Sequence, residues 1–317
     1  MSRQLSAIEK EDERLFNTPQ KWYVRRKWLE YSINRMRKNN RSFIRLLTLT
    51  CTQVYEIRLL LDNGLLLHTD SGAFDEHCLA FCEMVDHRYV LIRDALPGAR
   101  NFLGRLEDLV GAGRIGYSNR IDSWFPFDVI NLDINECILK RDSRIIEAIW
   151  KLFIIQKMKN QSFTLFLTIC SVESGNDKEK IKALYQSFEM NLTELDIEEI
   201  FHVSFPDGVI KAYHDLQSLI IPKKIIEYGL SEGFDIQYSE KLTYIGEGLS
   251  TRMLSFIFDC EYCGPREIAY LGSIRRDRIL SILDHSWKDI DQILQEDVEA
   301  SKVVMDLKSK YSDQVSY

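Results

Sequence analysis

Three short apolar runs, each ending in an aspartate, constrain the fold of this chain more than any other feature. They cover residues 65–70, 89–94 and 127–133 and end in Asp70, Asp94 and Asp133. Segments of helical length separate them, and such alternation predicts a parallel β-sheet with crossover helices. The carboxyl ends of parallel strands share one edge, where open α/β sheets bind ligands. We therefore predict a site at that edge, with the alternative that the aspartates only cap the strand ends.

The same alternation continues along the chain. Further strands are predicted over residues 42–50, 163–170, 234–245 and 252–261. The predicted fold class is α/β, with a seven-stranded, mostly parallel, doubly wound sheet that ends in an antiparallel hairpin. The predicted parts are an N-terminal helical extension over 1–41, an α/β domain over 42–265 with a helical insertion at about 177–228, and a helical tail over 266–317.

Composition narrows the class of protein further. The chain has 317 residues, of which 45% are hydrophobic, so it can bury a sizeable core. We predict no membrane association, because no apolar run reaches the ~18–20 residues that span a bilayer. An odd number of cysteines, seven, mostly within apolar runs, is typical of reduced thiols and predicts a cytoplasmic protein. Cys260 and Cys263 form an isolated CxxC, and we predict no metal site.

The order and spacing of the predicted strands resemble those of the class I S-adenosylmethionine-dependent methyltransferases, over about residues 42–262. The resemblance implies S-adenosylmethionine as cofactor, with Asp70 on its ribose and Asp94 and Ala95 near its adenine. It also implies that Asn131 and Asp133, at the end of the fourth strand, orient or deprotonate the methyl acceptor.

The first loop departs from the pattern of this family. The family's glycines let the backbone approach the methionine part of the cofactor, whereas residues 50–56 here contain no glycine. We predict that hydroxyl and amide groups replace that approach, from a loop that includes Thr50, Cys51, Thr52 and Tyr55. The alternative is a catalytically inactive relative that retains the fold and serves as a binding or scaffold subunit.

A basic segment near the N-terminus suggests a partner. Residues 21–45 contain nine Lys or Arg and one acid, a net charge of +8 in a chain of net charge −7. Aromatic residues interleave the charges, a composition that suits RNA or DNA. The predicted nucleic-acid contacts are Lys21, Arg25, Arg26, Lys27, Arg35 and Arg37. Two alternatives remain: charges that pair with acids elsewhere in the chain, and an acidic protein partner. The predicted function is methyl transfer, with RNA as the favoured acceptor.

Overall fold

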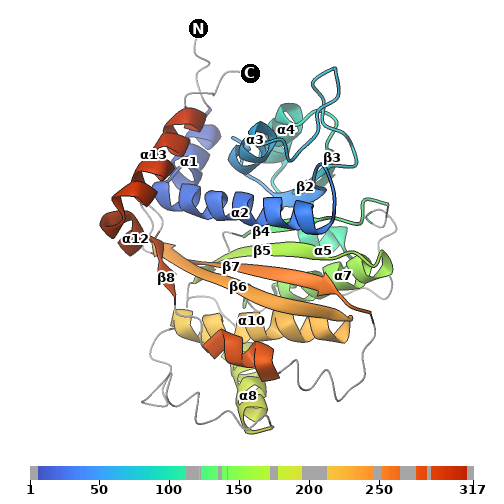
Figure 1. Cartoon of the computed structure of the whole chain (residues 1–317), viewed down its shortest axis with the longest axis vertical. Helices are drawn as coiled ribbons and strands as arrows, with labels where there is room; N and C mark the ends of the chain where they lie inside the picture. Colours follow the sequence, from blue (N-terminus) through green and yellow to red (C-terminus); the bar gives the residue numbers. More distant parts are fainter. Residues whose placement is uncertain are drawn as a thin grey trace.

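The computed structural model describes residues 6–111, 121, 123–134, 138–140, 142–171, 178–194, 213–245, 251–264, 276–283 and 287–312. Within them, eight strands form one sheet in the order β3-β2-β1-β4-β5-β7-β6-β8 (Figure 1). The strands are β1 (Leu46–Leu49), β2 (Leu79–Glu83), β3 (Arg100–Leu103), β4 (Val129–Asp133), β5 (Phe163–Ser171), β6 (Phe234–Ile245), β7 (Arg252–Tyr262) and β8 (Lys288–Asp289).

The direction of the strands defines a doubly wound sheet. Strands β1 to β5 pair in parallel, and β7 runs antiparallel to both β5 and β6. The predicted antiparallel pair of β6 and β7 is therefore confirmed, but β8, and not this pair, forms the edge of the sheet. The eighth strand, β8, was not predicted; it is two residues long and pairs in parallel with β6. Because β1 lies between β2 and β4, the order of the strands reverses at β1, which is the topological switch point of the sheet.

Helices cover both faces of the sheet because its side chains alternate between two apolar clusters. On one face, Leu46 and Val129 pack with α2 (Pro19–Lys38), α3 (Tyr55–Asp62) and α4 (Asp86–Ala95). On the other face, Leu47 and Ile130 pack with α5 (Leu106–Leu109), α7 (Ile145–Met158) and α10 (Tyr213–Ser231). In Figure 1, α2 lies along one face and α10 along the opposite face.

The N-terminal helices are part of this packing. Helix α2 begins at Pro19, and the side chain of Thr18 accepts a hydrogen bond from the Lys21 N–H, as the sequence predicts for a helix start. Helices α1 (Ala7–Phe16) and α13 (Val298–Ser312) lie beside each other at one end of α2 (Figure 1). Trp22 of α2 stacks on Tyr311 of α13 with 5.2 Å between ring centroids. Helix α12 (Ile290–Glu296) precedes α13.

The prediction of a second strand at 65–70 was wrong. In this segment only His68 forms a bridge, to Phe74, and Asp70 lies exposed in a turn. The second strand is β2, where Leu79, Ala80, Phe81 and Cys82 are buried. A strand covered on both faces has no alternation of polar and apolar residues, so its pattern does not distinguish it from a buried helix.

The prediction of a third strand at 89–94 was also wrong. These residues belong to α4, in which Ile92 is buried and Asp94 is exposed. A turn follows at Pro97-Gly98, where Gly98 has φ +86° and a Cβ would clash with the Phe74 carbonyl oxygen. The third strand, β3, comes after this turn and is only partly buried. Its weak apolar signal explains why a helix with a stronger one was mistaken for it.

Two helices fall in the predicted insertion. They are α8 (Lys178–Glu194) and α10, and residues 195–212 between them lie outside the described part. None of the described helices has the length and apolar character needed to cross a membrane.

Candidate functional site

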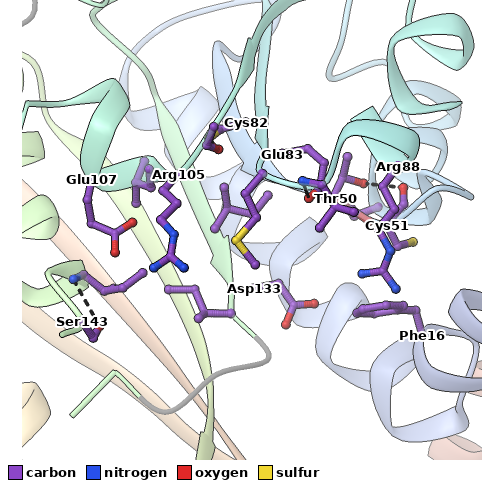
Figure 2. Close-up of a pocket in the computed structure, with 18 of the residues that line it drawn as sticks. Phe16, Thr50, Cys51, Cys82, Glu83, Arg88, Arg105, Glu107, Asp133 and Ser143 are labelled. Atoms are coloured by element: carbon purple, nitrogen blue, oxygen red, sulfur yellow. Dashed lines mark hydrogen bonds between the residues drawn. The ribbon is translucent and has the colours of Figure 1, made fainter. Parts of the chain in front are cut away.

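A cavity of about 500 Å³ lies at the carboxyl edge of the sheet, at the switch point. Its volume is within the range of small-molecule sites, about 300–1,000 Å³. The wall comes from the residues that end or follow β1, β2, β3 and β4, together with residues of the N-terminal helices and of the segment before α7. In Figure 2, Asp133 lies between Arg105, Glu107 and Ser143 on one side and Phe16, Cys51 and Arg88 on the other.

Glu83 is the acidic residue that ends the second strand. Its carboxylate is partly buried, lines the cavity, and accepts a hydrogen bond of 2.8 Å from the Val85 N–H. Burial raises the pKa of Glu83, against the opposing effect of Arg88. Because a carboxylate offers about four acceptor positions, Glu83 retains capacity for hydroxyl groups of a ligand. Glu83 thus occupies the position that the sequence had assigned to Asp70.

The first loop places only part of its predicted set at the cavity. Thr50 and Cys51 line it, whereas Thr52 and Gln53 are turned toward α1. The backbone N–H and hydroxyl of Thr52 both donate to Asp12, at 3.1 and 2.8 Å, and Gln53 donates to the Glu9 carbonyl at 2.6 Å. Side chains of the loop therefore leave room in the cavity despite the lack of glycine.

Tyr55, also predicted to contact the cofactor, does not line the cavity. Its ring is fully buried against Trp22, with 5.4 Å between centroids, and its hydroxyl donates to Glu13. The residue before it, Val54, has φ +48°, a left-handed conformation that β-branched residues rarely adopt. Burial raises the pKa of Cys51 to about 12, so this thiol is neutral at physiological pH.

Asp133 and Asn131, the two predicted catalytic residues, lie in different surroundings. Both oxygens of Asp133 are 2.7 Å from Nζ of Lys21, and the two side chains are 9% and 4% exposed. Burial alone would lower the pKa of Lys21, but Asp133 and Tyr244 raise it above its usual value. Asn131 is buried away from the main cavity and donates to the Thr48 hydroxyl at 3.3 Å. Of the two predicted catalytic residues, only Asp133 faces the cavity.

Arg25 and Glu56 line the cavity next to the first loop. Arg25 is 1% exposed and donates to the Phe16 carbonyl at 2.7 Å. Its Cζ lies over the rings of Trp22 and Tyr55, 4.9 and 5.0 Å from their centroids. Its Nε lies 4.0 Å from Glu56 Oε2 and has no hydrogen-bond partner among the described residues. Burial raises the pKa of Glu56, against the opposing effect of Arg25.

The residues predicted to bind ribose and adenine lie elsewhere. Asp70 is exposed in its turn, Asp94 pairs with Arg93 on the surface of α4, and Ala95 ends that helix. None of the three lines the cavity. The correction follows from the strand assignment, because these residues do not reach the carboxyl edge.

The basic segment is not the exposed surface that we predicted for nucleic acid. Lys21, Arg25 and Arg35 are at most 3% exposed, and Arg35 pairs with Asp259 and Glu261 of β7. The other three predicted contacts are less buried. Arg26 pairs with Glu30, and Lys27 pairs with Glu30 and Glu240. Arg37 is exposed. The aromatic residues Trp22 and Trp28 are buried as well. Most of the charges of α2 pair with acids on the sheet. This is the alternative in which the positive charges pair with acids elsewhere in the chain.

Sequence reasoning missed several residues of the cavity wall: Phe16, Glu83, Arg88, Arg105, Glu107 and Lys140. The turn at Pro97-Gly98 was a usable signal, because it separates α4 from β3 and would have placed Arg105 and Glu107 after the third strand. No cluster of three potential metal ligands occurs among the described residues. Cys260 is buried and Cys263 exposed.

Among family models, curated proteins and solved structures, only solved structures show similarity to this chain. The sequence matches no protein-family model and no curated protein. Among solved structures, the plantazolicin methyltransferase BpumL, in complex with a pentazolic desmethylPZN analog and SAH, is similar with a TM-score of 0.40 and 12% identity over 79% of this chain and 88% of that chain. The same enzyme with a triazolic analog and SAH gives 0.39 and 13% over 88% and 83%. Similarity this low assigns neither a cofactor nor a substrate. The fold and cavity alone define this chain as a doubly wound α/β protein with a cavity at its switch point.

Proposed function

We propose that this protein binds S-adenosylmethionine in the cavity at the switch point and transfers its methyl group. One observation carries the proposal. The cavity coincides with the switch point, and the strand beside β1 ends there in a carboxylate, Glu83. A carboxylate at this position suits the two hydroxyls of a ribose, because it accepts from both.

The lining fits the other parts of the cofactor. Apolar side chains of Leu106, Ile134 and Ile145 provide a surface for the adenine ring, and Glu107 lies beside them as an acceptor for its amino group. Thr50 and Cys51, which follow the first strand, line the cavity and would contact the ribose or the methionine part. When bound, S-adenosylmethionine supplies an electrophilic methyl group.

The chain's own contribution is binding and orientation. Lys21 engages both oxygens of Asp133, so Asp133 is held as a fixed negative group at the cavity floor. An acceptor would have to share those oxygens with Lys21. Positioning of two reactants can supply a large part of a rate enhancement without strong base catalysis. The prediction of an RNA acceptor depended on exposed charges of α2, and the burial of Lys21, Arg25 and Arg35 weakens its support.

Calorimetric titration with S-adenosylhomocysteine tests the proposal. The wild-type chain should bind saturably, and Glu83→Gln should weaken binding about tenfold or more, since hydrogen bonds to a charged group contribute about 1.5–3 kcal/mol. Asp70→Asn is the matched control, because Asp70 is an exposed acid outside the cavity. Absence of binding, or equal affinity of wild type and Glu83→Gln, would contradict the proposal.

A binding subunit without cofactor is the second candidate. It is favoured by Asp12, whose carboxylate takes up the backbone N–H of Thr52 in the first loop and also pairs with Arg88 at 2.7 Å. A loop whose donors are satisfied within the chain has fewer groups to offer a ligand. In that case the same titration gives no binding in a folded sample.

A further inference from the structure

A group of four charged side chains lies where the cavity meets the N-terminal helices. Lys21 and Arg25, one turn apart on α2, face Asp133 at the end of β4 and Glu56 in the first turn of α3. The two pairs differ in geometry. Lys21 and Asp133 are in close contact at 2.7 Å, whereas Arg25 Nε and Glu56 Oε2 are 4.0 Å apart.

The looser pair is held in place by other contacts. The Phe16 carbonyl and the rings of Trp22 and Tyr55 fix the guanidinium of Arg25. Its Nε donor nevertheless has no hydrogen-bond partner among the described residues, at a side chain that is 1% exposed. A buried donor without a partner destabilises the folded state, and more so when the group is charged. The Thr48 hydroxyl, at 3.5 Å, is a weak partner for Glu56.

We propose that Arg25 and Glu56 form a zwitterion site, in which Arg25 binds the carboxylate and Glu56 the ammonium of the amino-acid end of S-adenosylmethionine. This inference rests on the proposed function. It adds that Arg25 and Glu56 bind the methionine part of the cofactor, which the first loop, without glycine, does not approach through its backbone. A planar guanidinium suits a carboxylate, and a fixed guanidinium loses little entropy on binding one. The N-terminal helix α2, predicted to bind nucleic acid, would thus supply part of the cofactor site.

Position supports this assignment. Arg25 and Glu56 line the same cavity as Thr50 and Cys51, which end the first strand. Glu83, the proposed ribose ligand, lines that cavity from the neighbouring strand. Burial raises the pKa of Glu56, against the opposing effects of Arg25 and the Thr50 hydroxyl. An ammonium group would give this buried carboxylate a charged partner at hydrogen-bond distance, which Arg25 Nε at 4.0 Å is not.

Two ligands that differ in the amino-acid end distinguish binding of that end by Arg25 and Glu56 from a purely structural role of these residues. S-adenosylhomocysteine carries the amino-acid end, and 5′-methylthioadenosine lacks it. Calorimetry with both should show that Arg25→Met weakens S-adenosylhomocysteine about 10- to 150-fold, equivalent to about 1.5–3 kcal/mol, and leaves methylthioadenosine unchanged. Glu56→Gln, which keeps the shape of the side chain, should do the same and serves if Arg25→Met does not fold.

Arg35→Met is the matched control. Arg35 is equally buried on α2 but pairs with Asp259 of β7 and does not line the cavity. Its replacement should leave the ratio of the two affinities unaltered. An unchanged ratio in both Arg25→Met and Glu56→Gln, with wild type binding both ligands, overturns the zwitterion site alone. Failure of wild type to bind either ligand overturns the proposed function and this inference together.

Discussion

The pair between Lys21 and Asp133 gives a direct test of how α2 is attached to the sheet. The side chains are 4% and 9% exposed, and both Asp133 oxygens contact Nζ at 2.7 Å. Lys21→Met keeps most of the aliphatic stem and removes the charge. It leaves the Asp133 carboxylate buried without its partner, a change that destabilises proteins by about 3–5 kcal/mol.

For a chain of 317 residues this loss corresponds to a fall in Tm of about 4–8 °C, from an unfolding entropy of about 2.1 cal/mol/K per residue. Urea unfolding followed by circular dichroism measures the free energy of unfolding. Arg37→Met, an exposed change on the same helix, should stay within about 0.5 kcal/mol of wild type. The double variant Lys21→Met with Asp133→Asn should recover much of the loss, because no uncompensated charge remains.

The effect should depend on pH in one direction. The pKa of Lys21 is raised in the folded protein, so the stabilisation is fully present below the pKa of an unfolded lysine, about 10.4, and is lost as pH rises through the folded value. Lysine stays protonated between pH 7 and 9, so the difference in free energy of unfolding between wild type and Lys21→Met should persist over that range. The difference should shrink above about pH 10.4. A variant as stable as Arg37→Met would refute the reasoning, because it would show that the buried pair does not form.

Two further predictions concern groups at the cavity. Glu56 has a raised pKa, so the folded state holds its proton more tightly, and stability should fall as pH rises above about 4.3, the unfolded value. Glu56→Gln should remove that decline, and denaturation curves between pH 4 and 8 that run parallel for the two proteins would contradict it. With a pKa of about 12, roughly one Cys51 in ten thousand is a thiolate at pH 8, so iodoacetamide should spare Cys51 in the native protein and label the exposed Cys263. Peptide mass spectrometry measures both, and rapid native labelling of Cys51 would show that its thiol is accessible.

The strands that sequence predicted correctly have apolar runs or, in β6, an alternation of apolar and polar residues. Strands β4, β5, β6 and β7 match their predictions closely, and Asp133 consequently falls where it was expected. Strands β2 and β3 have five and four residues, and β3 is only partly buried. A segment with a stronger apolar run, residues 89–94, was taken for β3. Residues 65–70 were taken for the second strand because they are apolar and end in an aspartate, so the acid at the end of that strand was assigned to Asp70 instead of Glu83.

The basic helix shows a different limit of sequence reasoning. The cap at Thr18 and the start at Pro19 are local, and the sequence predicted them. The partners of its charges are not local, because Lys21 and Asp133 are 112 residues apart and Arg35 and Asp259 are 224 apart. Periodicity cannot reveal such pairs, so a run of positive charge looked like a surface for a polyanion. Folding instead brings those charges onto acids of the sheet.

A crystal structure of the protein with saturating S-adenosylhomocysteine tests the central claim most directly, after calorimetry has established saturation in solution. We expect the ligand in the cavity at the switch point, with both ribose hydroxyls donating to the Glu83 carboxylate. A ligand bound elsewhere on the chain, or in the cavity with its ribose away from Glu83, would contradict it.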